Sequence, residues 1–359
     1  MSANLSNWEG PHIDVTAENR AIDWWYTQVI SLTPAPNGVP PSIEVTLKHG
    51  NTFQYGSSNT PLYSVDINGF DQDGLPFAQT IVFNSSSVSS TDSGDTFGIW
   101  GANDSEITFI ANPDRKKFTV SLNTTYATGT IIINSDSSAR TGCGGTSLTD
   151  SPFFSDLVSD GRELTAAEVI LYRKTGWRIT IPDGPSTVDV VLGGKAVQFQ
   201  GAGYKDSNWG PNAMNDFIMS WYVLIARVGP WSFVTFSGNP INGTNFINSG
   251  HLSYEGEFVT SQCNIIGERS TDISIITPSG QVVDSNVIAP TAFDVTFVLP
   301  DAKNISFHAD NIAVNPSVSV YHRWTAKYTG GTVGGQQYES YGITEWMNAG
   351  NISQWIYIQ

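Results

Sequence analysis

The fold is decided by a pattern that first appears in residues 24–30, which read Trp24-Trp25-Tyr26-Thr27-Gln28-Val29-Ile30. Aromatic and β-branched residues dominate this stretch, and such residues are favoured in strands. Stretches of the same length and alternating character recur to the end of the chain, for example at 117–122, 177–181 and 294–299, with clusters of Gly, Pro, Asn, Asp and Ser between them. The period is therefore two rather than the 3.6 of a helix, and it predicts strands throughout.

Helix signals are scarce, which narrows the architecture. The best helix candidate is the short run 162–168, and the glycine-rich run 330–335 is typical of a loop. The turn residues Asp71-Gln72-Asp73-Gly74 lie between two strand-like runs and predict a hairpin. Without helical crossovers a parallel sheet is excluded, and antiparallel sandwiches or barrels remain.

The chain is long enough for two modules. Its 359 residues exceed the size at which a single core stops growing, and about twenty strands are too many for one small barrel. Gly, Asn and Pro concentrate between Gly201 and Asn215, which places the break there. We predict domains at 1–211 and 212–359.

Charge and hydropathy exclude two classes of partner. The 33 acidic residues outnumber the 17 basic ones and give a net charge of −16, which repels nucleic acid. No apolar run approaches the roughly 20 residues that a membrane-spanning helix needs. Apolar small molecules are the predicted partners.

Most cofactor and metal chemistry lacks a sequence signature. The chain has no Gly-x-Ser-x-Gly elbow, no phosphate-binding loop and no dinucleotide fingerprint. Its five histidines are scattered without the i, i+2 or i, i+4 partners typical of a metal site. We therefore predict neither a cofactor nor a bound metal.

Two aromatic and polar segments interrupt the simple alternation. The first is Asp23-Trp24-Trp25-Tyr26, and the second spans residues 201–210 and continues through Asn215-Asp216 to Trp221-Tyr222. A tryptophan in a β-sandwich is more often core than pocket, and the adjacent Lys205 and Asp206, whose side chains alternate in direction, are compatible with surface ion pairing. The density of Tyr, Lys, Asp, Asn and Trp between two modules nevertheless favours a ligand site.

The pairing of Asp23-Trp24-Trp25-Tyr26 with Gly203-Tyr204-Lys205-Asp206-Ser207-Asn208-Trp209-Gly210 resembles the hydroxyneurosporene synthase superfamily. Gly342-Ile343-Thr344-Glu345 is similar to the end of that family's last strand. The resemblance implies an all-β fold of two lipocalin-like antiparallel β-sandwich or barrel domains packed side by side.

Within this superfamily, Asn215-Asp216 and Val228-Gly229-Pro230 are similar to the fungal Diels–Alderases, and Asn68 falls where those enzymes bind a carbonyl. Lys205 replaces the histidine of the carotenoid hydratases, and the first Trp strand lacks the acidic residue that decalin-forming enzymes carry near the place of Trp25. Both departures favour the secreted hetero-Diels–Alderases, which join a tropolone quinone methide to a humulene-type sesquiterpene. A decalin-forming Diels–Alderase, a terpenoid hydratase or isomerase, and a non-catalytic carrier remain alternatives.

This resemblance implies roles for two groups of residues. Lys205, Asn68 and Tyr204 are candidate hydrogen-bond donors to a substrate carbonyl, and Asp206 or Tyr222 is the candidate general acid for loss of water. The residues expected to line an apolar substrate site are Asp23, Trp24, Trp25, Tyr26, Trp221, Trp324, Tyr341 and Trp346.

Cysteines and sequons bear on localisation. Cys143 and Cys263 are compatible with one long-range disulfide or two buried thiols, and we predict the disulfide if the protein matures in the secretory pathway. Residues 2–7 are polar, so we expect either a removed signal or a cytoplasmic protein. The candidate glycosylation sites are Asn84, Asn103, Asn123, Asn242, Asn304 and Asn351.

Overall fold

A computed structural model of the chain describes residues 8–102, 105–143, 151–154, 163–241, 247–265, 274–284, 287–299, 303–318 and 320–349. These residues form antiparallel sheets with one α-helix, so the predicted all-β antiparallel class is confirmed. Contacts divide the chain into two units. The first comprises Met1–Thr141, Thr146–Asp150 and Gly176–Ala213, and the second comprises Gly142–Gly145, Ser151–Thr175 and Met214–Gln359.

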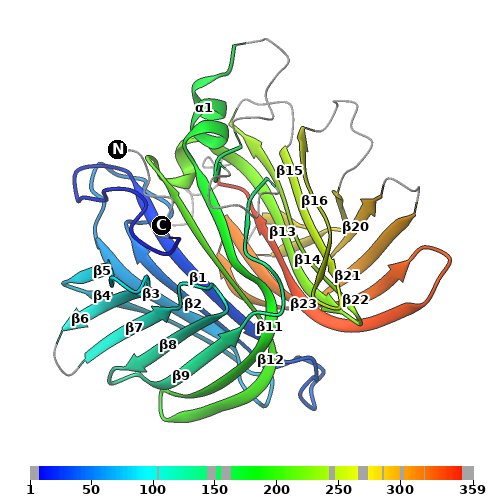
Figure 1. The fold of residues 1–359 in the computed structure, drawn as a ribbon, viewed down its shortest axis with the longest axis horizontal. Helices are drawn as coiled ribbons and strands as arrows, with labels where there is room; N and C mark the ends of the chain where they lie inside the picture. Colours follow the sequence, from blue (N-terminus) through cyan, green and yellow to red (C-terminus); the bar gives the residue numbers. More distant parts are fainter. Residues whose placement is uncertain are drawn as a thin grey trace. The chain divides into compact units, whose positions relative to one another are not determined.

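In the described part of the first unit, twelve strands form one sheet in the order β4-β3-β2-β1-β12-β11-β9-β8-β7-β6-β5, with β10 paired to β11 (Figure 1). The strands are β1 (Ile22–Ile30), β2 (Ser42–His49), β3 (Tyr63–Phe70), β4 (Pro76–Phe83), β5 (Ser86–Ser90), β6 (Thr96–Ala102), β7 (Ser105–Ala111), β8 (Lys117–Asn123), β9 (Ala127–Asn134), β10 (Arg140–Thr141), β11 (Gly176–Leu192) and β12 (Lys195–Gly210). The sheet brings β1 beside β12, where Ile30 lies opposite Ala202 although their positions differ by 172 in the sequence (202 − 30). The predicted hairpin is also present, because β3 ends at Phe70, β4 begins at Pro76, and the Gly74 amide donates to the Asp71 carbonyl.

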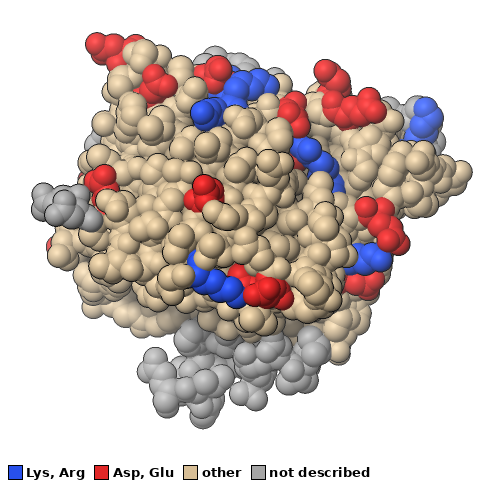
Figure 2. Space-filling view, turned by 90° about the horizontal axis from the view of Figure 1, so that it is seen from below, with Lys and Arg blue, Asp and Glu red and all other residues tan. Residues whose placement is uncertain are grey.

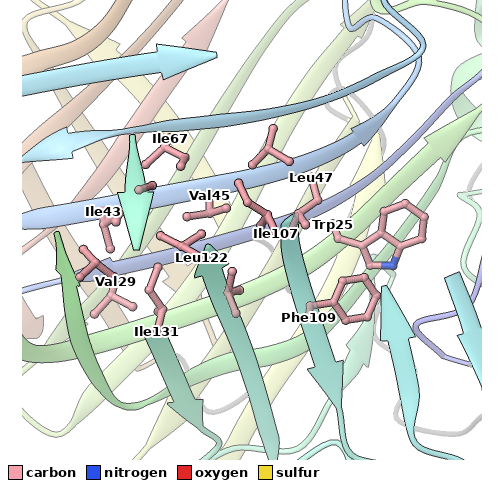
Figure 3. Packing of buried hydrophobic residues seen from close by; sticks show 14 of the residues in the cluster. Trp25, Val29, Ile43, Val45, Leu47, Ile67, Ile107, Phe109, Leu122 and Ile131 are labelled. Atoms are coloured by element: carbon pink, nitrogen blue, oxygen red, sulfur yellow. The ribbon is translucent and has the colours of Figure 1, made fainter. Parts of the chain in front are cut away.

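The core of the first unit lies on one face of this sheet. Figure 3 shows side chains of β1, β2 and β3 pointing toward side chains of β7, β8 and β9, and all of those labelled there are buried. At one end of the cluster the Trp25 ring packs edge-on against Trp100 at 5.5 Å. Burial of each large apolar side chain contributes about 1.5–3 kcal/mol. The alternate residues of β1, β2 and β12 consequently point to the opposite face.

In the described part of the second unit, nine strands form a sheet in the order β16-β15-β14-β13-β23-β22-β21-β20-β17, and β18 pairs with β19. The elements are η2 (Met214–Asp216), β13 (Ile218–Val228), β14 (Trp231–Pro240), β15 (Ile247–Tyr254), β16 (Glu257–Ile265), β17 (Ser274–Ser279), β18 (Val282–Asp284), β19 (Val287–Ala289), β20 (Ala292–Val298), β21 (Asn304–Val318), β22 (Tyr321–Thr332) and β23 (Gln337–Met347). Phe233 lies near the centre of the core, where it stacks on Phe307 at 4.6 Å and meets Tyr328 edge-on.

The helix and the glycine-rich run correct two expectations. Helix α1 spans Ala166–Arg173, not 162–168, because Thr165 caps it and Glu168 completes a capping box. It groups with the second unit, as does Phe154, whose ring stacks on Phe236 of β14 at 5.9 Å. The run 330–335 is only partly a loop, because Gly330 and Gly331 belong to β22. Gly330 has a φ of +154°, and a Cβ there would lie 2.2 Å from the Ser306 carbonyl oxygen, so a glycine is required within the strand.

Cys143 and Cys263 form a disulfide within the second unit, 120 residues apart in sequence. We expect the double variant Cys143→Ser/Cys263→Ser to lose about 2–4 kcal/mol of unfolding free energy, because the crosslink restricts the unfolded chain. Urea unfolding of both proteins measures the difference. A reducing agent should shift the wild-type midpoint and leave the variant unchanged, and equal midpoints for the two proteins without reductant would contradict the prediction.

The surface carries its charges in small groups. On the face shown in Figure 2, Lys and Arg lie in short clusters beside Asp and Glu, and most of the surface is uncharged. Among the described residues, no helix has the length and hydropathy required to span a membrane.

Candidate functional site

Residues 23–26 and 201–210, from the two segments singled out by the sequence, lie on neighbouring strands of the first unit. In the antiparallel pairing of β1 with β12, Trp24 lies opposite Asn208, Tyr26 opposite Asp206, and Thr27 opposite Lys205. Because side chains alternate along a strand, residues opposite one another share a face. Asp206 therefore shares a face with Trp24 and Tyr26, whereas Lys205 points to the opposite, core face.

On the core face, Lys205 is fully buried and paired with Glu9. Its ammonium lies 2.7 Å from Glu9 Oε2, donates to the Asp206 carbonyl oxygen at 2.7 Å and to Ser207 Oγ at 2.9 Å, and lies over the Phe118 ring. A surface ion pair between Lys205 and Asp206 is thereby excluded. Nothing in the sequence around Glu9 identified it as the partner, although a buried lysine requires one.

Asp23 and Trp25 also point to the core face, where both have partners in the N-terminal segment. The Asp23 carboxylate lies 2.9 Å from His12 Nδ1, and His12 stacks on the Trp209 ring at 3.9 Å. The Trp25 indole donates to the Glu9 carbonyl oxygen at 2.8 Å. These contacts give Asp23 and Trp25, like Lys205, structural partners on the core face rather than on the face that carries Asp206.

The opposite face carries a buried carboxyl group with several donors around it. Asp206 Oδ2 accepts from the Tyr204 hydroxyl at 2.7 Å and from the Trp177 indole at 2.8 Å, and Oδ1 accepts from the Asn208 amide at 3.1 Å. Burial raises the pKa of Asp206, opposed by the Tyr204 hydrogen bond and the charge of Lys205. Burial, together with the nearby Asp206, raises the pKa of Tyr204 well above its usual value. Asp206 can therefore hold a proton at higher pH than an ordinary aspartate, while Tyr204 stays a neutral donor.

Asn68 belongs to the same face. The strand register runs from Asn68 to Glu44, Gln28 and Tyr204, so these four side chains form a row across β3, β2, β1 and β12. The Asn68 amide and the Thr46 hydroxyl both donate to the Glu44 carboxylate, and the Tyr26 hydroxyl donates to Gln28 at 2.6 Å. We call this largely buried set, in which Tyr26 and Asn208 are partly exposed, the Asp206 face. It is defined by Trp24, Tyr26, Gln28, Glu44, Thr46, Asn68, Trp177, Tyr204, Asp206 and Asn208.

Sequence reasoning missed several members of the Asp206 face. Glu44 and Thr46 lie in β2, where Ile43, Val45 and Leu47 alternate with them and enter the core. That period-two pattern was a signal that could have located both polar residues. Trp177 begins β11, and its indole reaches Asp206 only because β11 pairs with β12.

The remaining predicted residues lie in the second unit. Tyr222, Trp346 and His322 lie opposite one another on three neighbouring strands, and Trp324 shares their face. His322 is fully buried, with its ring 5.3 Å from Trp346 and 5.4 Å from Trp324. This face is part of the second unit's core, and burial raises the pKa of Tyr222.

Trp221 and Tyr341 do not join that row. Both are odd-numbered, whereas the residues of the row are even-numbered. Because side chains alternate along a strand, both therefore point to the opposite face of the sheet. The Trp221 ring meets Phe236 edge-on at 5.8 Å. The thirteen candidates thus occupy both faces of both sheets, and the structure groups Asn68, Tyr204 and Asp206 with Trp24 and Tyr26.

Comparisons with known proteins identify a family, two relatives and a structural neighbour. A family described as Diels-Alderase-like matches residues 53–349. The quinolone epoxide rearrangement protein penF of Penicillium thymicola is 26% identical over 163 residues, which cover 44% of this chain and 43% of that protein. The quinolone epoxide rearrangement protein asqO of Emericella nidulans is 24% identical over 95% of this chain and 86% of its own length. The crystal structure of CghA with Sch210972 superposes with a TM-score of 0.70 at 16% identity, covering 95% of this chain and 94% of CghA, and shows a shared fold.

Proposed function

Because the chain belongs to the Diels-Alderase-like family, we propose that it is an enzyme of secondary metabolism that cyclises or rearranges a largely apolar molecule without a cofactor. The observation that carries the proposal is the buried Asp206 carboxyl, whose pKa is raised and which lies among aromatic rings. Two reactions need a neutral proton or hydrogen-bond donor in a site that excludes water. They are the opening of an epoxide and the activation of a carbonyl-bearing partner for a diene. The names of penF and asqO favour the first reaction, and the family description favours the second.

In an epoxide rearrangement, the neutral Asp206 carboxyl transfers its proton to the epoxide oxygen while a carbon–oxygen bond breaks. The carboxylate that forms accepts the hydrogen bonds already supplied by Tyr204, Trp177 and Asn208. The group that migrates to the electron-deficient carbon forms the new bond, and the proton that the rearranged cation then loses restores the acid. Lys205 is assigned a positioning role here, since its ammonium binds the Asp206 carbonyl oxygen.

The more specific hypothesis is the hetero-Diels–Alder union of a tropolone quinone methide with a humulene-type sesquiterpene. The same carboxyl serves both of its steps. It protonates the departing hydroxyl of a hydroxymethyl precursor, regains a proton from the ring hydroxyl that becomes the quinone methide oxygen, and then donates a hydrogen bond to that oxygen. Cycloaddition also requires two π-systems held in reacting geometry, and an aromatic face provides such alignment. The family description and the Asp206 carboxyl support this hypothesis. Decalin formation, alkene hydration and ligand binding without reaction are the other outcomes of the experiment described next.

The test supplies purified protein with a quinolone epoxide, a hydroxymethyl tropolone plus humulene, and a linear polyene with a terminal carbonyl-bearing ring. Products are identified by chiral chromatography with mass spectrometry against heat-treated protein. Conversion of one substrate with a single stereochemical outcome, abolished in Asp206→Asn, supports the proposal. Recovery of every substrate unchanged would favour a carrier.

Tyr204→Phe is expected to move the alkaline limb of the pH–activity profile to higher pH. The Tyr204 hydrogen bond stabilises the carboxylate and lowers the pKa of Asp206, so its removal raises that pKa further. An acid that must be protonated loses activity as pH rises through its pKa, and the loss is therefore postponed in the variant. Measuring kcat/KM against pH for Tyr204→Phe and for Tyr126→Phe, which lies in the β8–β9 turn, tests this. A downward shift, or the same shift in both variants, would contradict it.

We also propose maturation in the secretory pathway, with a cytoplasmic protein as the alternative. The Cys143–Cys263 disulfide supports it, because such bonds persist mainly in oxidising compartments. Among the glycosylation candidates, Asn84 and Asn123 are exposed and Asn304 is half-buried. Asn103, Asn242 and Asn351 lie outside the described residues.

A further inference from the structure

The indole N–H of Trp24 is buried without a hydrogen-bond partner among the residues that the structure describes. Trp24 is only 7% exposed and lies in β1, between Lys48 of β2 and Asn208 of β12. An indole N–H can only donate, and a buried donor left unpaired is costly. Such a group in a folded protein requires an explanation.

Other indoles of the first unit show how such donors are usually satisfied. Trp25 donates to the Glu9 carbonyl at 2.8 Å, Trp100 donates to the Lys48 carbonyl at 3.0 Å, and Trp177 donates to Asp206 at 2.8 Å. Trp8 also has an unpaired N–H, but its ring lies against the guanidinium of Arg178 at 5.0 Å, away from the Asp206 face. Among the described residues of the Asp206 face, Trp24 is the tryptophan whose indole N–H has no hydrogen-bond partner.

Three donor side chains follow one another along a single row of this face. Trp24 lies opposite Asn208, and Asn208 lies opposite Trp177 on β11. The Asn208 amide and the Trp177 indole both donate to the Asp206 carboxyl group. The third donor, on Trp24, has no acceptor among the described residues.

We propose that the Trp24 N–H binds a carbonyl oxygen of the substrate, beside the oxygen on which Asp206 acts. The inference rests on the proposed function and narrows the substrate to apolar ring systems that carry a carbonyl group. A carbonyl oxygen is a neutral acceptor that an indole can pair without any proton transfer. Bound substrate then satisfies a donor that has no partner among the described residues, and Trp24 selects against analogues that lack the oxygen.

Fluorenone and fluorene test this, since they share a rigid apolar skeleton and differ in a carbonyl in place of a methylene. Calorimetric titration of the wild-type protein should show fluorenone bound about five- to tenfold more tightly, the range expected of one hydrogen bond. Trp24→Phe should bind both probes alike, with fluorene affinity little changed. Its melting temperature should fall less than that of Trp25→Phe, because both variants lose ring volume but, among the described residues, only Trp25 loses an indole hydrogen bond.

Trp25→Phe is the matched control, because it removes an indole N–H that is paired with Glu9. It should melt at a lower temperature and keep the preference for fluorenone. If Trp24→Phe fails to fold, replacing Trp24 with benzothienylalanine keeps the bicyclic shape and removes only the donor. No preference in the wild-type protein, or a preference that survives either Trp24 replacement, overturns the inference. Normal turnover by Asp206→Asn would instead refute the proposed function and leave this binding result standing.

Discussion

Asp206→Asn is expected to lower kcat/KM by about 100-fold or more, which corresponds to roughly 2.7 kcal/mol of lost transition-state stabilisation. The amide preserves the size of the side chain and an acceptor oxygen for Tyr204 and Trp177, but it has no acidic proton. The raised pKa of Asp206 means that the folded protein gains little from the ionised carboxylate. Substitution by a neutral amide should therefore change the melting temperature by only a few degrees.

Asp66→Asn is the matched control for this prediction. Asp66 lies on the same row of the sheet as Asp206, and Thr46 and Tyr26 lie between them. Its side chain is 31% exposed and is paired with Lys48 at 2.5 Å. Asp66 is not among the residues that contact Asp206, so we expect turnover close to wild type, with a modest loss of stability from the weakened pair with Lys48. Equal losses in both variants, or more than a third of wild-type activity in Asp206→Asn, would place the acid elsewhere.

Glu9→Leu is expected to destabilise the protein by about 3–5 kcal/mol, because it leaves the Lys205 ammonium buried without its counter-charge. The carboxylate joins two strands of the first unit, because it binds Lys205 and Ser207 of β12 and accepts from Thr180 of β11. Lys205→Met should cost a similar amount, since it leaves the Glu9 carboxylate buried. The double variant Glu9→Leu/Lys205→Met should recover most of the stability, because an apolar pair replaces the whole ion pair.

Urea unfolding of the two single variants and the double variant measures this coupling, and Lys195→Met provides the comparison. Lys195 is paired with Asp71 and Asp73, but its side chain is 48% exposed, so its loss should cost less than about 1 kcal/mol. Additive losses in the double variant would contradict a buried ion pair. The turnover of the folded double variant also tests the role of Lys205, because a lysine that contacts substrate would lose activity as Asp206→Asn does.

Much of the fold could be predicted from local pattern. Alternation along the strands predicted the β class, and the turn residues Asp71 to Gly74 predicted the hairpin between β3 and β4. The start of α1 was also encoded locally, in the Thr165-x-x-Glu168 capping box, although composition alone placed the helix several residues too early. These features depend on residues within a few positions of one another.

By itself, the sequence determined the strands, the turn and the parity of neighbouring side chains, including the fact that Lys205 and Asp206 point to opposite faces. Which parity enters the core depended on the tertiary structure, since β1 and the 202–210 part of β12 are largely buried on both faces and carry polar and aromatic residues on each. The tertiary structure also decided that Glu9 neutralises Lys205 across 196 residues and that Trp177 reaches Asp206. Such pairings depend on which strands become neighbours, and strand order is set by the burial of the whole sheet rather than by any local segment of the chain.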